Sequence, residues 1–261
     1  MTGRRPPLLL LIPAAGALAL ILVPLAGLLG HVPWTTLLTQ ITSNQVGSAL
    51  LLSLECSLLA VAVALVLGVP LAWTLARTSF PGKALVRALV TLPMVLPPVV
   101  GGVALLLAFG AHGFAGQALA HLGITLPFTT AGAVVAETFV AMPFLIIAVE
   151  AGLRQADERY EEAAATLGAA PWMRFWRVTL PLIAPSLAAG AALTWARALG
   201  EFGATITFAG NLPGTTQTMP LAVYVALESD TDGAIALSLV LLVVSLGVLI
   251  GLRHRWLGAT G

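Results

Sequence analysis

Six long apolar runs constrain what this chain can fold into more than any other feature. A helix needs about 20 mostly apolar residues to cross the roughly 30 Å hydrocarbon core of a bilayer. These runs are continuous in Leu, Ala and Val and lack the strict alternation of a barrel strand, so they predict transmembrane helices. With 59% apolar and 9% charged residues, the composition of the chain is far outside that of a soluble globular domain. The predicted spans are residues 8–29, 49–76, 84–108, 131–149, 187–209 and 234–252.

The first run is predicted to be a retained helix and not a secretion signal. Arg4 and Arg5 precede it, as basic residues precede a signal sequence. Its length of about 22 residues exceeds the roughly 7 to 15 of a signal core, and no small-residue cleavage site closes it. We therefore expect one all-helical integral membrane domain over residues 1–261.

The distribution of basic residues predicts the topology, because Lys and Arg accumulate in cytoplasmic loops. Every basic residue except Arg197 falls on one side of the membrane, whereas the other side carries Glu228, Asp230 and Asp232. Both termini and the loop 150–186 are therefore expected in the cytoplasm. The basic residues used are Arg4, Arg5, Arg77, Lys83, Arg87, Arg154, Arg159, Arg174, Arg177, Arg253 and Arg255.

The third run contains a proline-rich segment, LPMVLPPVVGG, at residues 92–102. Pro93, Pro97 and Pro98 each remove a backbone donor and clash with the preceding turn, so a straight helix is not expected. Irregular backbone at membrane depth is tolerated where protein or a water-filled cavity covers it. The segment either borders a pathway or is a packing kink with close glycine contacts.

Four ionisable residues lie well inside the predicted spans: Glu55, Glu137, Arg197 and Glu201. Such residues are costly in lipid and are expected to face protein or water. Arg197 and Glu201 are four residues apart on one predicted helix, close enough to pair. The pair is either a structural ion pair or part of a route for an anion, and Glu55 and Glu137 are weaker candidates for either role.

The residues predict no catalytic site. Cys56 is the single cysteine, the four histidines lack metal-ligand spacing, and no phosphate-binding loop with a following Lys and Ser or Thr is present. We expect neither enzyme activity nor a metal or cofactor in this chain, and no nucleic-acid partner. Any ATP-driven work would need a separate subunit.

The predicted cytoplasmic loop has the pattern of two short helices. Asp157 is the expected N-cap of the first helix, which would end at Gly168. Pro171 suits the first turn of a second helix, which is expected to stop before Pro181. On these residues alone, an interfacial hairpin with Trp172 and its neighbours at the headgroups is the alternative.

The spacing in this loop carries a family resemblance. Glu162, Ala163, Ala164 and Gly168 are followed, after nine residues, by Val178, Thr179, Leu180 and Pro181. This pattern resembles the EAA loop of permease subunits of bacterial type I ABC importers, although Ile is more frequent there at the place of Val178. The resemblance implies a coupling helix that docks on an ATP-hydrolysing partner, which would bind ATP and Mg²⁺. The implied coupling residues are Glu162, Ala163, Ala164, Gly168, Leu180 and Pro181.

A narrower resemblance rests on residues 92–102 and on 196–224, ARALGEFGATITFAGNLPGTTQTMPLAVY. From about Ser48 onward the chain looks like the molybdate permease branch, close to the sulfate and thiosulfate permeases. This resemblance implies a homodimer, two ATPase subunits and an extracytoplasmic oxyanion-binding protein. Molybdate is the expected substrate, with sulfate, thiosulfate or tungstate as alternatives.

Alternating access would then reopen the helices around 93–102 and 197–203. Residues that are candidates for the pathway or its gate are Pro93, Pro97, Pro98, Gly101, Arg197, Glu201, Gly203 and Thr205. A secondary transporter driven by an ion gradient is the alternative from another class. It would need a relay within the membrane, to which four scattered ionisable residues contribute little.

Overall fold

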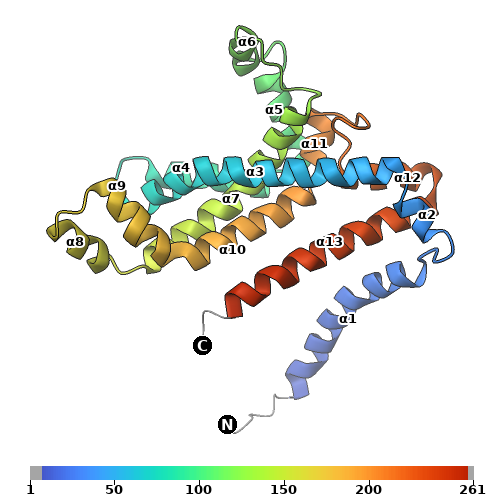
Figure 1. Cartoon of the computed structure of the whole chain (residues 1–261), viewed down its shortest axis with the longest axis horizontal. Coiled ribbons are helices and arrows are strands. Elements are labelled where there is room, and N and C mark those ends of the chain that lie inside the picture. The colour runs from blue at the N-terminus through green and yellow to red at the C-terminus, as the bar shows by residue number, and fades with distance from the viewer. Residues whose placement is uncertain (1–7, 258–261) are drawn as a thin grey trace.

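The computed structural model describes residues 8–257, and within this range every regular element is a helix. Arg4 and Arg5, which entered the topology prediction, lie outside the described residues. Figure 1 shows long helices running side by side with shorter ones at both ends. The elements are α1 (Leu8–Gly30), α2 (Leu37–Ile41), α3 (Asn44–Arg77), α4 (Lys83–Val95), α5 (Pro98–Phe109), α6 (Phe114–Ala120), α7 (Thr130–Gln155), α8 (Arg159–Thr166), α9 (Pro171–Arg174), a π-helical turn (Phe175–Thr179), α10 (Leu180–Leu199), α11 (Gly203–Phe208), α12 (Met219–Ser229) and α13 (Thr231–Leu257).

The centre of the molecule is a three-helix bundle of α3, α7 and α10. Small residues let the three backbones approach closely, as is usual between membrane helices. A Cβ added to Gly68 of α3 would lie 3.2 Å from Ile146 Cγ1, and one added to Gly190 of α10 would lie 2.9 Å from Ala148 Cβ. Apolar side chains with almost no exposed surface fill the space between the helices: Ala64, Leu75, Leu145, Val149, Leu153 and Ile183.

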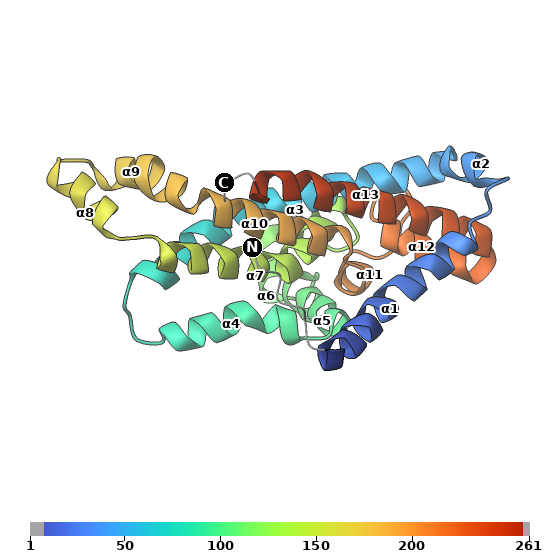
Figure 2. The same ribbon diagram turned by 90° about the horizontal axis from the view of Figure 1, so that it is seen from below.

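In contrast, α1 and α4 contribute little to the core. Every described side chain of α1 is exposed except Leu28, which is half-buried, and no residue of α4 is buried. Both views show α1 running away from the bundle, with α8 and α9 at one end of the molecule and α2 at the other (Figures 1 and 2). The chain therefore presents long apolar helix faces that its own fold leaves uncovered.

Several described helices are long and apolar enough to cross a membrane, and they correspond to predicted spans. They are Leu9–Gly30, Gln45–Arg77, Thr130–Gln155 and Pro171–Leu199, and α4 with α5 provides a fifth if the bent pair is counted as one span. The last predicted span, 234–252, falls in α13, where Thr231–Gly247 forms a shorter apolar helix. The all-helical fold is confirmed, and the number of six spans stays a prediction.

The third run is broken, as expected, and α4 meets α5 at a bend of 117°. Two other boundaries differ from the sequence prediction. The fifth predicted span, 187–209, is wrong as a single helix, because α10 ends at Leu199 and α11 begins after a short break. The expected stop before Pro181 is also wrong, since Pro171–Leu199 is one continuous helix.

The π-helical turn explains how the helix passes Pro181. A proline inside an α-helix removes one backbone hydrogen bond and clashes with the carbonyl four residues earlier. The wider turn over Phe175–Thr179 lies directly before Leu180 and Pro181. A π turn changes the hydrogen-bond register by one residue, so the proline is accommodated and the helix does not end there.

Candidate functional site

Two consecutive prolines, and not the first one in the segment, produce the break between α4 and α5. Pro93 lies inside α4 without ending it. Leu96, which precedes Pro97, has φ −64° and ψ 136°, the extended conformation that a following proline favours. Pro98 is the first residue of α5, where a missing N–H is tolerated and the fixed φ suits a helix start.

A second break, between α10 and α11, is made without proline. Gly200 follows the last residue of α10, and Glu201 is then buried with a side chain that is 1% exposed. Its Oε1 accepts a hydrogen bond from the backbone N–H of Ala204 at 2.8 Å. This bond satisfies one of the N–H groups that a helix start leaves unpaired. The sequence GEFG, an acid between two glycines, was the available signal for this break.

Glycines bring the two short helices that follow these breaks into backbone contact. A Cβ added to Gly102 of α5 would lie 2.6 Å from Thr207 Cβ and 2.9 Å from the carbonyl oxygen of Ala204, both in α11. A Cβ added to Gly203 of α11 would lie 2.8 Å from Pro98 Cβ. The predicted candidates Pro98 and Gly203 are thus brought together. Gly102, which the sequence reasoning included in the segment 92–102 but did not name as a site residue, makes the closest of these contacts. Figure 1 shows α5 and α11 beside each other, away from the long axis of the bundle.

The ion pair predicted between Arg197 and Glu201 is confirmed. Arg197 Nη1 lies 2.6 Å from Glu201 Oε2, and the arginine side chain is 28% exposed. Both carboxylate oxygens are therefore engaged, one by the end of α10 and one by the start of α11. The contacts join the end of α10 to the start of α11, as a structural ion pair would, and a part in an anion route stays a prediction.

The remaining intramembrane candidates have different environments. Glu137 is 1% exposed, and its Oε2 has no hydrogen-bond partner among the described residues. Thr205 is fully buried, and its hydroxyl likewise has no partner in the described part of the chain. Glu55 is exposed on α3. Gly101 is buried, and a Cβ added there would meet the ring of Phe139 at 3.2 Å.

The predicted coupling residues lie on an exposed segment at one end of the molecule. In α8 and the turn that follows, Glu162, Ala163 and Gly168 are exposed and Ala164 is half-buried. Gly168 has φ +84°, a left-handed conformation that favours glycine at a helix end. Leu180 is half-buried and Pro181 is exposed at the start of α10. The N-cap of α8 is Glu158, whereas the sequence predicted Asp157. The Asp157 side chain instead accepts a hydrogen bond from the backbone N–H of Arg159, the first residue of the helix.

Ion pairs join this segment to α3. Arg77, at the last turn of α3, pairs with Glu158 and with Glu161, and its side chain is only 9% exposed. The sequence used Arg77 only as a topology marker, because local spacing gives no information on which helix it faces. Beyond α8, Trp172, Phe175 and Trp176 pack their rings on one another, with centroids 5.4 to 6.3 Å apart.

The described residues contain no group of three or more His, Cys, Asp or Glu side chains that could hold a metal ion. The chemistry of the described part of the chain is instead that of two broken helices in close contact, an ion pair at one break, and an exposed helical segment tied to the bundle.

Comparisons with known proteins agree with this geometry. Residues 64–259 match the family described as binding-protein-dependent transport system inner membrane component. The chain is 45% identical over 244 residues to the molybdenum transport system permease protein ModB of Mycobacterium tuberculosis, covering 94% of this chain and 92% of the relative. It is 43% identical to ModB of Escherichia coli over 80% of this chain and 92% of the relative. It is 39% identical to the sulfate transport system permease protein CysT of Escherichia coli over 90% of this chain and 86% of the relative.

Solved structures have the same fold. A bacterial ABC transporter involved in the import of the acidic polysaccharide alginate matches with a TM-score of 0.78 at 20% identity, over 97% of this chain and 95% of the matched chain. The MetNI methionine ABC transporter matches with a TM-score of 0.63 at 18% identity, over 83% and 99%. The family match covers well over half of the chain, which therefore belongs to the binding-protein-dependent transport system inner membrane components.

Proposed function

We propose that this chain is the membrane-spanning permease subunit of an ATP-driven importer and that it forms the translocation path for molybdate. The observation that carries the substrate is the similarity to ModB proteins, at 45% identity over 94% of this chain, above the 39% identity to the sulfate permease. Sulfate, thiosulfate and tungstate are the alternative oxyanions. The proposed subunit is a single domain over residues 1–261 with six spans.

The proposed site of energy input is the exposed segment from α8 to α9. Leu167 is 88% exposed and Trp172 is 71% exposed, so two large apolar side chains stand at its surface. Apolar side chains on an exposed segment favour a protein partner. In the proposed complex, each of two ATPase subunits binds ATP and Mg²⁺ and docks on Glu162, Ala163, Ala164 and Gly168 of one permease copy.

A second copy of this chain is the proposed partner within the membrane. The uncovered faces of α1 and α4 support this assignment, since Leu9, Leu20 and Val95 are each more than three-quarters exposed. In a homodimer, α5 and α11 of both copies would border the path, with Arg197 as the partly exposed cation of the ion pair beside it. The proposed gate consists of the two broken helices.

The proposed topology places both termini and α8 in the cytoplasm of a bacterial cell, with an oxyanion-binding protein docking on the opposite side of the inner membrane. The bias of Lys and Arg towards the α8 side supports it. Single cysteines introduced at Leu167 and at Asp230, in intact cells treated with a membrane-impermeant thiol reagent, test it. Labelling of the Leu167 variant from outside would reverse the assignment.

Reconstitution tests the function. The chain is placed in proteoliposomes with its ATPase and its binding protein, and uptake of radiolabelled molybdate is measured with and without ATP and with sulfate or tungstate as competitor. We expect uptake only with ATP and both partners. Uptake by the chain alone under an ion gradient would instead establish a secondary transporter. Glu162→Lys is expected to lower both uptake and co-purification of the ATPase, and unchanged values would refute the docking role.

A further inference from the structure

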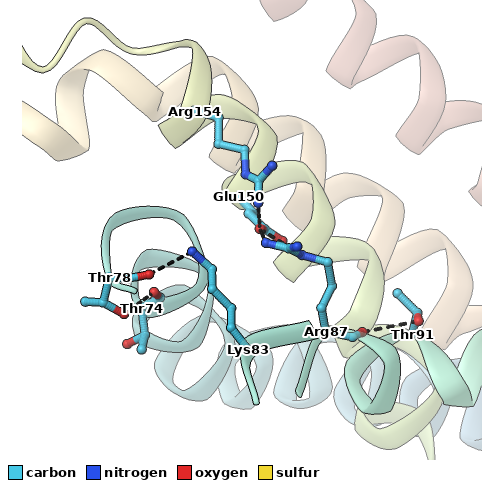
Figure 3. A network of polar contacts seen from close by, with 7 residues as sticks. All are labelled: Thr74, Thr78, Lys83, Arg87, Thr91, Glu150 and Arg154. Carbon is cyan, nitrogen blue, oxygen red and sulfur yellow. Dashed lines mark hydrogen bonds and ion pairs between the residues drawn. The ribbon is translucent and has the colours of Figure 1, made fainter. Parts of the chain in front are cut away.

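One carboxylate, that of Glu150, is shared by two arginines on different helices. Its Oε1 accepts from Arg87 Nε at 3.2 Å and Arg87 Nη2 at 2.6 Å, and from Arg154 Nη2 at 2.7 Å. Glu150 and Arg154 both lie in the last turns of α7, whereas Arg87 comes from α4. In Figure 3 the carboxylate lies between the two guanidinium groups, with Arg87 reaching to it from α4.

This contact is the polar attachment of α4 to the bundle. Among the described residues, Arg87 is the one side chain of α4 that hydrogen-bonds to another helix. Lys83 bonds only the carbonyl oxygen of Thr78 in the preceding turn, and Thr91 bonds carbonyl oxygens of α4 itself. Val86 and Val90 of α4 add apolar contacts to the buried side chains of the three-helix bundle. Because no residue of α4 is buried, the Arg87–Glu150 pair has a large share in holding this helix against α7.

The attachment lies between the two functional regions of the chain. Towards one side, α7 ends at Gln155, and the loop leads within a few residues to α8. Towards the other side, α4 runs into the 117° bend and α5, whose Gly102 is in contact with α11. A movement of α8 that displaces the end of α7 therefore reaches the broken helix through Glu150.

The second arginine gives the attachment the property of a switch. The Glu150 side chain is 9% exposed, and a buried carboxylate that loses its only partner is strongly destabilising. Arg154 also pairs with Glu150 at 2.7 Å, and since both lie one turn apart on the same helix, this contact does not depend on the position of α4. Departure of α4 therefore does not leave the carboxylate unpaired. Arg87 is 39% exposed and Arg154 is 52% exposed, so either guanidinium reaches water when released.

We propose that Glu150 is a positioning residue for transport: α4 attaches to it through Arg87 in one state and leaves it in another, while Arg154 keeps the charge compensated. This inference rests on the proposed function. It predicts different effects on transport and ATP hydrolysis for the loss of each arginine. Without Arg87, α4 is no longer coupled to α7, and ATP is hydrolysed without transport. Without Arg154, release of α4 becomes slow, and hydrolysis and transport decline together.

The first test measures molybdate uptake and ATP hydrolysis by the reconstituted complex. We expect Arg87→Gln to lower uptake per ATP by at least about fivefold, the low end of coupling between linked sites. Arg154→Gln should lower uptake and hydrolysis by a common factor. The charge-reversed triple variant Arg87→Glu, Glu150→Arg, Arg154→Glu should recover the unsubstituted ratio. An unchanged ratio in Arg87→Gln, or no recovery in the folded triple variant, would overturn the proposal.

The second test restrains the attachment. Arg87→Cys and Glu150→Cys are combined in a Cys56→Ala background and joined by a reducible bifunctional thiol reagent, with the two single-cysteine variants as matched controls. Because both substitutions remove the ion pair, the double variant is expected to hydrolyse ATP with little uptake before cross-linking. Cross-linking should stop this uncoupled hydrolysis in the double variant only, and reduction should restore it. Unchanged hydrolysis after cross-linking, or a loss that reduction does not reverse, refutes the switch. If the unsubstituted complex itself takes up no molybdate, the proposed function fails instead.

Discussion

Substitution of Gly102 by alanine probes the backbone contact between α5 and α11. The added Cβ would lie 2.6 Å from Thr207 Cβ, 2.9 Å from the Ala204 carbonyl oxygen and 3.0 Å from Ala204 Cα. Carbon atoms in good contact are about 3.5 to 4.0 Å apart, so the helices must separate by about 1 Å. Two of the three atoms belong to the backbone and cannot rotate away. Overpacking of this kind costs about 1–3 kcal/mol.

Gly101→Ala is the matched control, because it lies in the same helix and gains the same helix propensity, about 1 kcal/mol. Its Cβ would meet only the Phe139 side chain, at 3.2 Å. The assay is thermal unfolding of the purified protein in detergent, followed by tryptophan fluorescence at one scan rate. At about 2 to 4 °C per kcal/mol, Gly102→Ala should unfold at least about 2 °C below Gly101→Ala. Equal unfolding temperatures would show that α5 and α11 are not in backbone contact.

Three further predictions concern single side chains. Glu201→Ala removes both the pair with Arg197 and the bond to the Ala204 N–H, so the free energy of unfolding should fall by about 2–4 kcal/mol. Glu201→Gln keeps an acceptor for the Ala204 N–H and should be less destabilised, and equal destabilisation of the two variants would contradict the capping role. Glu137→Gln replaces a buried carboxyl by an uncharged isostere and should keep stability within about 1 kcal/mol, whereas a larger drop would reveal an ionic partner in the assembly. Gly168→Val places a branched residue at φ +84° and should lower ATP-dependent uptake, while the unfolding temperature changes little. Gly168→Asn should lower uptake less, because asparagine tolerates this conformation, and equal uptake by the two variants would refute the turn requirement.

The fold class was predictable because it depends on composition and run length, which are local properties. Leu9–Gly30 and Thr130–Gln155 lie within one to six residues of the predicted ends. The proline break was predictable for the same reason, since Pro97 and Pro98 act on their own backbone. The break at Glu201 was missed because it depends on a buried side chain that caps a helix three residues later.

The ion pairs between different helices were not predictable from the sequence. Arg77 and Arg87 were visible only as positive charges on one side of the membrane. Their partners, Glu161 and Glu150, lie 84 and 63 residues away in the chain, and no local period relates them. The pairing of helices depends on the packing of the whole bundle. Close backbone contacts, such as that of Gly102 with Ala204, contribute to this packing together with the charges.

The unbroken path from α9 through the π turn into α10 has a mechanical consequence. Its 29 residues form one rod about 43 Å long at 1.5 Å per residue. A tilt of about 5° about one end of such a rod displaces the other end by roughly 4 Å, from the same length. One end carries the aromatic rings of Trp172 and Trp176, which pack edge to face, and the other carries Arg197. A small rotation at the aromatic end of the rod is therefore large enough to shift its Arg197 end relative to α5 by more than the length of an ion pair.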